Sequence, residues 1–213
     1  MAATHVFSKK EELANATIHG IGAALSIVAI VLLVVFSSLE GTALHVVSFL
    51  IYGVTMLLLY LSSTLVHSFP EGKTKDLFEI FDHSAIYLFI AGSYTPLLFH
   101  VVQGKLGWVL FGVVWGMAVL GVVFKAFYAK KFLYTSTILY ILMGWLIVFA
   151  WKPLLLNLSG NGLTLLIIGG LLYTVGTVFY VWRSFPYHHA IWHLFVLAGS
   201  IFHFFVILLY ILP

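Results

Sequence analysis

The stretch from Arg183 to His203 reads RSFPYHHAIWHLFVLAGSIFH. A short segment that contains Pro186 leads into a long apolar run, and the first turns of that run carry three histidines. His189 and His193 are four residues apart, so on a helix they lie on one face, one turn apart. Two imidazoles in this arrangement can bind one metal ion, provided that other segments bring further ligands to the same depth.

The composition of the chain excludes an ordinary soluble domain. Hydrophobic residues make up 62% of the sequence and charged residues 8%, with a mean hydropathy of +1.12, whereas charged residues make up about 25% of a soluble domain. A chain with so little polar surface is expected to lie largely in lipid. It has no basic face with interleaved aromatic residues, so no nucleic-acid partner is expected. Cysteine is absent, so any metal ion must be held by His, Asp, Glu or water.

Apolar runs of about 20 residues, long enough to cross a bilayer as helices, recur along the whole chain. They predict an all-α integral membrane protein with seven transmembrane helices, in which residues 1–213 form a single domain. The first run is longer than the apolar part of a signal peptide, so we interpret it as retained. The expected spans are residues 17–39, 42–66, 83–102, 107–124, 132–151, 163–182 and 189–212.

The distribution of Lys and Arg between the connections predicts the orientation. Eight of these residues fall before the first span or in the second, fourth and sixth connections, and only Lys105 and Lys152 fall on the other side. The positive-inside rule therefore places the N-terminus in the cytoplasm and the C-terminus in the extracellular space. The eight residues are Lys9, Lys10, Lys73, Lys75, Lys125, Lys130, Lys131 and Arg183.

With this topology, three spans bring polar residues to the same leaflet. His67 ends the second span, Asp82 lies at the start of the third, and His189 and His193 lie in the first turns of the seventh. All four are expected near the cytoplasmic side. Ionisable groups in membrane spans are costly and usually mark function, so this convergence predicts a metal site.

The predicted chemistry is hydrolysis of a lipid amide or ester. Three neutral histidines with an open position for water form the usual catalytic zinc layout, and zinc lowers the pKa of such a water towards neutrality. Asp82 would orient the water or accept its proton, and Ser63, one turn before His67, would lie close by. Asp82 also has a structural interpretation as the N-cap of the third helix, which is compatible with the catalytic one.

Other polar residues receive weaker assignments. His19 follows Asn15 by one turn at the cytoplasmic end of the first span and is a candidate support for the site. His83 and His188 are expected to have simple interfacial roles. His203 lies about 15 Å deeper than His193 at 1.5 Å per residue and is expected to be buried and hydrogen-bonded. The charged segment at residues 9–12 is expected to form a solvated face at the membrane surface.

Three motifs, taken with the seven spans and the inward N-terminus, resemble the progestin and adipoQ receptor family, and in particular its bacterial branch, hemolysin III. They are Ser63-x3-His67, Phe81-Asp82 at the start of the third span, and His189-x3-His193 on the seventh. The early segment EELANATIHGIG, residues 11–22, is typical of the bacterial members. The resemblance covers nearly the whole chain and implies a multi-pass protein of the bacterial plasma membrane.

The resemblance also implies a cofactor and an activity. In the related adiponectin receptors, zinc is bound by histidines that match His67, His189 and His193. The aspartate that matches Asp82 contacts the zinc-bound water, and the serine that matches Ser63 lies nearby. More distant relatives are alkaline ceramidases, which implies a ceramidase-like hydrolase acting on a membrane lipid. The name hemolysin carries the expectation of a pore-forming or cytolytic protein.

Two classes of function therefore remain open. The first is a zinc-dependent hydrolase of membrane lipids, and the second is a non-enzymatic pore-former or sensor of membrane state in which zinc is structural. The outer halves of the spans are almost purely apolar, which favours the enzyme over a pore. A proton or ion transporter that uses the same histidines is a third alternative, and the sequence leaves the oligomeric state open.

Overall fold

The structure, a computed structural model, describes residues 7–212, and within this range it consists of helices and their connections, without β-strands. Seven helical segments of this range are long and apolar enough to cross a membrane, which confirms an all-helical, multi-pass membrane protein. In chain order the elements are α1 (Lys9–Glu40), α2 (Ala43–Ser68), α3 (Lys73–Leu97), the π-helical η1 (Leu98–Val102), α4 (Gly104–Tyr128), α5 (Leu133–Gly144), the 3-10 helix η2 (Trp145–Ala150), α6 (Trp151–Asn157), α7 (Gly160–Val181) and α8 (His188–Tyr210).

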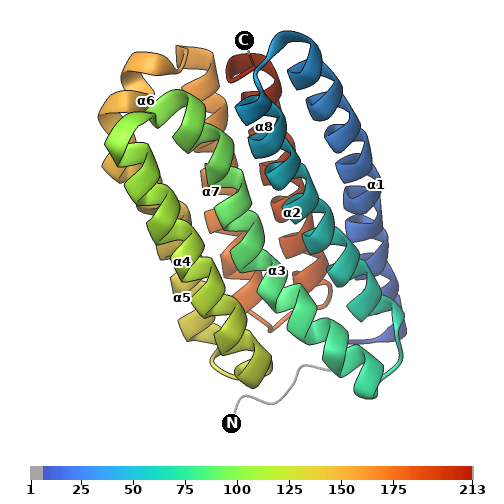
Figure 1. Cartoon of the computed structure of the whole chain (residues 1–213). Helices are drawn as coiled ribbons and strands as arrows, with labels where there is room; N and C mark the ends of the chain where they lie inside the picture. Colours follow the sequence, from blue (N-terminus) through green and yellow to red (C-terminus); the bar gives the residue numbers. More distant parts are fainter. Residues whose placement is uncertain (1–6, 213) are drawn as a thin grey trace.

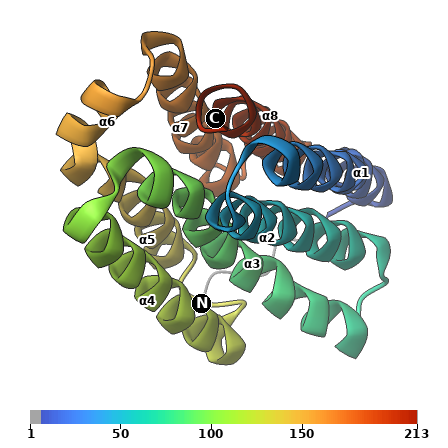
Figure 2. The same cartoon turned by 45° about the horizontal axis from the view of Figure 1, so that its top comes forward.

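The helices form one bundle, in which neighbours in sequence are mostly neighbours in space (Figure 1). α2 lies between α1 and α3, while α8 returns to pack against both α7 and α1. The view from nearer the bundle axis shows α4 and α5 on the side away from α1 (Figure 2). Because α8 packs against α1, the first and last spans are neighbours, and the first turns of α1 lie beside the first turns of α8.

The outer surface of the bundle is apolar. Leu39, Leu120, Phe127 and Leu156 are all more than 70% exposed. In water such a surface would be strongly unfavourable, but in a bilayer it contacts lipid tails. Inside the bundle, buried polar side chains occur along its length, and at one end they include Asn15, His67 and Asp82. The arrangement is therefore that of an integral membrane protein whose polar chemistry lies in its interior.

α1 begins eight residues before the expected first span. Ser8 is its N-cap: the Ser8 hydroxyl accepts a hydrogen bond from the Glu11 amide at 3.3 Å, and the Glu11 carboxylate accepts one from the Ser8 amide at 2.9 Å. This reciprocal capping box supplies partners for amides that a helix start leaves without any. The charged residues 9–12 thus belong to the helix, which extends eight residues before the apolar run predicted to start at residue 17.

α3 likewise extends beyond the predicted span, beginning at Lys73, ten residues before residue 83. Its N-cap position is Gly72, and Asp82 lies more than two turns inside the helix. The interpretation of Asp82 as a helix N-cap was therefore wrong. Polar residues continue a helix beyond the bilayer as readily as apolar ones, and here Lys130 holds the first turn of α3 through a hydrogen bond to Asp76 at 2.5 Å.

The remaining spans differ from the expected ones by smaller amounts, except for the fifth. That span was expected to end at residue 151, but helical structure continues through η2 and α6 to Asn157.

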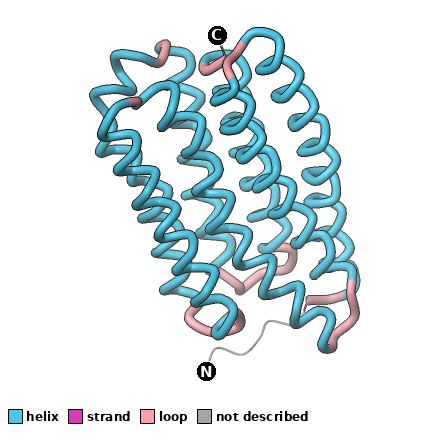
Figure 3. The backbone as a smooth tube through the Cα atoms, in the orientation of Figure 1, coloured by secondary structure: helices cyan, strands magenta, loops and turns pink. Residues whose placement is uncertain are grey.

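The connections gather at the two ends of the bundle (Figure 3). The eight lysines and arginines counted above lie towards the end where α1 and α8 begin, although Lys125 is buried inside α4, with 1% of its surface exposed.

Candidate metal centre

Three histidines converge at the end of the bundle where α2 finishes and α8 starts. His67 lies in the last turn of α2, and His189 and His193 lie in the first two turns of α8. One ring nitrogen from each of them lies within 4.8 Å of the others. His67 and His193 are buried, while His189 is partly exposed. The structure thus brings together the three histidines that the sequence singled out.

In His67 and His193 the two ring nitrogens have different surroundings: Nδ1 contacts an oxygen of α1, and Nε2 has no hydrogen-bond partner among the described residues. Nδ1 of His67 lies 2.5 Å from the Glu12 carboxylate, and Nδ1 of His193 lies 3.4 Å from the Asn15 carbonyl oxygen. Carboxylate and carbonyl oxygens only accept hydrogen bonds, so in both rings Nδ1 carries the proton. Nε2 is then a lone-pair donor, and in both residues it is buried without a hydrogen-bond partner among residues 7–212.

This arrangement fits a metal ion of the zinc type. Metal-binding histidines usually donate their other N–H to a carboxylate or a backbone carbonyl, which fixes the ring orientation. An all-imidazole ligand set without thiolates suits zinc. The third ring, His189, lies 4.5 Å from the His193 ring and 5.1 Å from the His67 ring, measured between centroids. The residues present could therefore hold zinc through three imidazoles.

Asp82 and Ser63 lie beside this cluster. Both are buried, with 7% and 0% of their surface exposed. The Ser63 hydroxyl lies next to the Asp82 carboxyl and within reach of an interaction, although its geometry falls outside that of a regular hydrogen bond. The Asp82 carboxyl is also within electrostatic range of His67. A carboxylate at this place can accept or hold a proton close to the imidazoles.

Asn15 and His19 are completely enclosed on α1. Their exposed fractions are 0% and 1%, and both polar side-chain atoms of each residue lack a hydrogen-bond partner in the described part of the chain. Leaving a buried polar group without a partner costs about 1–3 kcal/mol. Such groups are rare in folded proteins and need an explanation, such as a bound water, ion or ligand.

Glu12 is the residue that sequence reasoning missed. It was assigned to a solvated face, but its side chain is only 17% exposed and contacts both His67 and Lys75 at 2.5 Å. The solvated-face prediction was wrong for this residue because the helix starts earlier and α2 and α3 cover it. The spacing of Glu12, Asn15 and His19 placed them on one helix face, and this was the signal that could have identified it.

Two other histidines, His83 and His188, were expected to have simple interfacial roles, but their rings contact the protein interior. His188 was expected at the interface but is fully buried, with Nδ1 donating to the Phe179 carbonyl at 3.0 Å. His83 is partly buried, and its Nδ1 bonds to the Glu79 carbonyl at 2.7 Å. Both rings are thus tied to backbone carbonyls instead of facing water. His203 is hydrogen-bonded as expected, through Nε2 to the Leu166 carbonyl at 3.2 Å.

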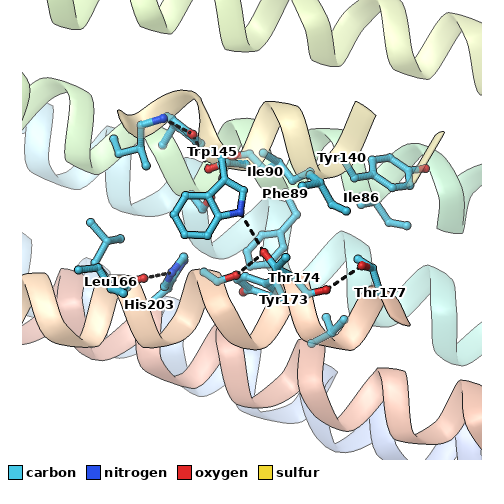
Figure 4. Close-up of a pocket in the computed structure, with 18 of the residues that line it drawn as sticks. Ile86, Phe89, Ile90, Tyr140, Trp145, Leu166, Tyr173, Thr174, Thr177 and His203 are labelled. Carbon is cyan, nitrogen blue, oxygen red and sulfur yellow. Dashed lines mark hydrogen bonds between the residues drawn. The ribbon is translucent and has the colours of Figure 1, made fainter. Parts of the chain in front are cut away.

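A cavity of about 170 Å³ extends from the site into the bundle. Asp82 and His19 line it, together with mostly apolar residues of α3, α5, α7 and α8. His203 also lines it, and Figure 4 shows its ring hydrogen-bonded to Leu166. Val148 and Trp151 also line the cavity and are 48% and 45% exposed on the outer surface. The cavity therefore reaches the lipid-facing side of the protein.

Comparison with known proteins identifies the family of this chain. The family model described as haemolysin-III related matches residues 7–204. The chain is 56% identical over 205 residues to the "Hemolysin-3 homolog" of Bacillus subtilis (strain 168), covering 96% of both chains. It is 54% identical over 204 residues to "Hemolysin-3" of Bacillus cereus, covering 96% of this chain and 93% of the relative.

A more distant relative is human. The chain is 33% identical over 170 residues to the "Monocyte to macrophage differentiation factor" of Homo sapiens, and the match covers 76% of this chain and 69% of the relative. The resemblance to hemolysin III that rested on three short motifs is thereby confirmed over nearly the full length. This chain, whose described residues contain seven helical segments long and apolar enough to span a membrane, belongs to the haemolysin-III-related family.

Proposed function

We propose that this protein is a zinc-dependent hydrolase that cleaves an amide or ester bond of a membrane lipid. The observation that carries the proposal is the state of His67 and His193: each has Nδ1 tied to an acceptor of α1 and Nε2 buried without a partner in the described residues. With His189 beside them, these atoms need a common electrophilic partner. Zinc held by three imidazoles would supply Lewis-acid activation of a water nucleophile at neutral pH.

The side chains around the cluster have distinct roles in this proposal. Asp82 accepts the proton of the attacking water and delivers it to the leaving group. Ser63, adjacent to the Asp82 carboxyl, holds that carboxyl in position. Asn15 and His19, whose side-chain polar atoms have no other partner within residues 7–212, donate hydrogen bonds to the oxygen of the scissile carbonyl as negative charge develops on it.

The cavity defines the class of substrate. One end carries Asp82 and His19, and the remaining lining is mostly apolar, so it suits a chain-bearing lipid whose polar linkage stops at the histidine cluster. The exposed cavity residues Val148 and Trp151 mark a route by which the lipid enters sideways from the bilayer. A ceramide-like amide or a lipid ester has this combination of one polar linkage and long apolar chains.

We place the site at the cytoplasmic leaflet of a bacterial plasma membrane. The end of the bundle that carries His67 and His193 also carries most of the lysines and arginines, and this asymmetry favours the cytoplasmic side. The Bacillus relatives support a bacterial plasma membrane.

Elemental analysis of detergent-purified protein tests the proposal. We expect about one zinc per chain in the wild type, because three imidazoles and a water complete a zinc site, and none in a variant with His67, His189 and His193 all replaced by alanine. Lipid amides and esters are then assayed with the zinc-loaded protein. Absence of zinc from both proteins, even after zinc is supplied, would exclude the hydrolase.

A second function is favoured by the names of the relatives. Two of them are called Hemolysin-3 or its homolog, and this name favours a cytolytic protein. The alternative is therefore a non-enzymatic pore-former, or a sensor of membrane state, in which a zinc ion held by the histidines would be structural. In that case zinc would bind but no lipid would be cleaved, and Asp82 variants would behave like the wild type in a vesicle-leakage assay. Lipid cleavage that is lost when Asp82 is replaced would favour the hydrolase over the cytolytic alternative.

A further inference from the structure

The first turns of α1 contact both of the helices that supply the histidines. Glu12 reaches His67 on α2, and the Asn15 backbone carbonyl reaches His193 on α8. The neighbouring Glu11 carboxylate accepts a hydrogen bond from the Tyr187 amide, directly before α8, at 2.9 Å. Three contacts from one short helical segment thus hold the end of α2 and the start of α8 in register.

Within this segment Glu12 has a distinct position. Its two carboxylate oxygens have different partners: Oε2 lies 2.5 Å from His67 Nδ1, and Oε1 lies 2.5 Å from Lys75 Nζ. Since the Lys75 ammonium favours the ionised carboxylate, Glu12 is an acceptor for the His67 N–H. Lys75 is held in turn by Glu71 at 2.8 Å.

We propose that Glu12 is a positioning residue for metal binding: it fixes the tautomer and the ring orientation of His67 and makes Nε2 a stronger donor. A carboxylate that accepts the second N–H of an imidazole raises the basicity of the metal-binding nitrogen. His193 receives the same orientation from a neutral carbonyl at the longer distance of 3.4 Å. The charged and shorter contact makes His67 the more strongly oriented of the two rings.

This inference rests on the proposed zinc site, but it concerns a different residue and a different measurement. It predicts that zinc affinity falls when Glu12 loses its charge, even though Glu12 itself binds no metal. Removing a second partner of this kind typically weakens metal binding by about 10- to 100-fold. The affinity is measured by competition with a chelator of known strength in detergent, so lipid hydrolysis is not needed as a readout.

The test compares Glu12→Ala, Glu12→Gln and Glu71→Gln with the wild type. We expect about 10- to 100-fold weaker zinc binding for Glu12→Ala and a smaller loss for Glu12→Gln, whose amide oxygen still accepts the His67 N–H. Glu71→Gln is the matched control, because Glu71 shares Lys75 but has a side chain that is 71% exposed and bonds to Lys75 and not to a histidine. It is expected to bind zinc as the wild type does.

Two further readouts separate positioning from general stability. The thermal unfolding of the metal-free variants shows whether Glu12→Gln folds normally, since Lys75 keeps its contact with Glu71. The visible absorption of the cobalt-loaded protein is expected to change in Glu12→Gln but not in Glu71→Gln, because it reports the ligand geometry. Unchanged zinc affinity in Glu12→Ala, or an equal loss in Glu71→Gln, would overturn the inference while leaving the hydrolase proposal in place. Absence of zinc from the wild type itself would instead remove both.

Discussion

The His19 ring lies flat against the His193 ring, with centroids 3.5 Å apart and planes only 14° from parallel. His19 comes from α1 and His193 from α8, so the stack joins the first and last spans. It places the ring nitrogens of His19 at the same depth as the histidine cluster. Both of these nitrogens lack a hydrogen-bond partner in the described chain. The His19 ring is therefore a candidate hydrogen-bonding partner for a substrate bound beside the histidine cluster.

Replacing Asp82 separates metal binding from chemistry. We expect Asp82→Asn to retain zinc and to lose lipid hydrolysis by about a hundredfold or more, because the amide cannot accept the proton of the attacking water. His193→Ala is expected to lose the metal itself. Zinc content and turnover are measured on the same preparations. Should Asp82→Asn lose zinc as completely as His193→Ala, Asp82 would have to be reassigned as a direct ligand.

Replacing Asn15 by leucine tests whether its amide serves folding or binding. The amide is buried without a partner among the described residues, so an apolar side chain of similar size removes a cost of about 1–3 kcal/mol. We expect Asn15→Leu to unfold at the same temperature as the wild type or higher, while hydrolysis falls. A clearly lower unfolding temperature would mean that the amide stabilises the fold instead.

Filling the cavity should change which substrates are accepted. Gly170 lines the cavity, and an added Cβ would lie 3.9 Å from the Trp145 ring. We expect Gly170→Leu to reduce cleavage of long-chain lipids by about tenfold or more, with short-chain analogues less affected and zinc content unchanged. Gly116→Leu is the control, because it faces open space on α4. Equal effects on long and short chains would argue that the cavity does not hold the chain.

The packing of α2 against α3 depends on a glycine. A Cβ on Gly92 would overlap the side chain of Thr55, whereas nothing in the described chain lies within 4 Å of a Cβ on Gly112. We expect Gly92→Ala to destabilise the protein by about 1–3 kcal/mol through overpacking. Gly112→Ala should be neutral or stabilise it by up to about 1 kcal/mol, since alanine favours helix. Chemical unfolding in detergent measures both, and similar values for the two would contradict the close approach of α2 and α3 at Gly92.

The orientation can be measured directly because the chain has no cysteine. A single cysteine in place of Lys152, at the end opposite the histidine cluster, is expected to react with an impermeant thiol reagent on intact cells. A cysteine in place of Lys131, in the α4–α5 connection, should react only after the membrane is opened. The reverse pattern would place the histidine cluster at the outer leaflet and overturn the positive-inside assignment.

The sequence by itself predicted that the chain lies in lipid, that it crosses the membrane seven times and that three histidines of different spans lie together. A chain that must satisfy its backbone hydrogen bonds in lipid has to cross as continuous apolar helices, so the seven spans can be read from hydropathy. Spans of similar length that alternate in direction also set the depth of each residue. This is why His67, His189 and His193, which come from spans far apart in sequence, were expected together.

Only the tertiary structure decided where the helices begin, how they are rotated and what they cover. Hydropathy reports the thickness of the bilayer and not the ends of a helix, so α1 and α3 extend beyond the predicted spans at their N-terminal ends. The rotation of α1 against α2 and α8 depends on packing between side chains from distant parts of the chain. That rotation buries Glu12 against His67 and stacks His19 on His193, and no pattern within a single helix specifies which neighbour its polar face will meet.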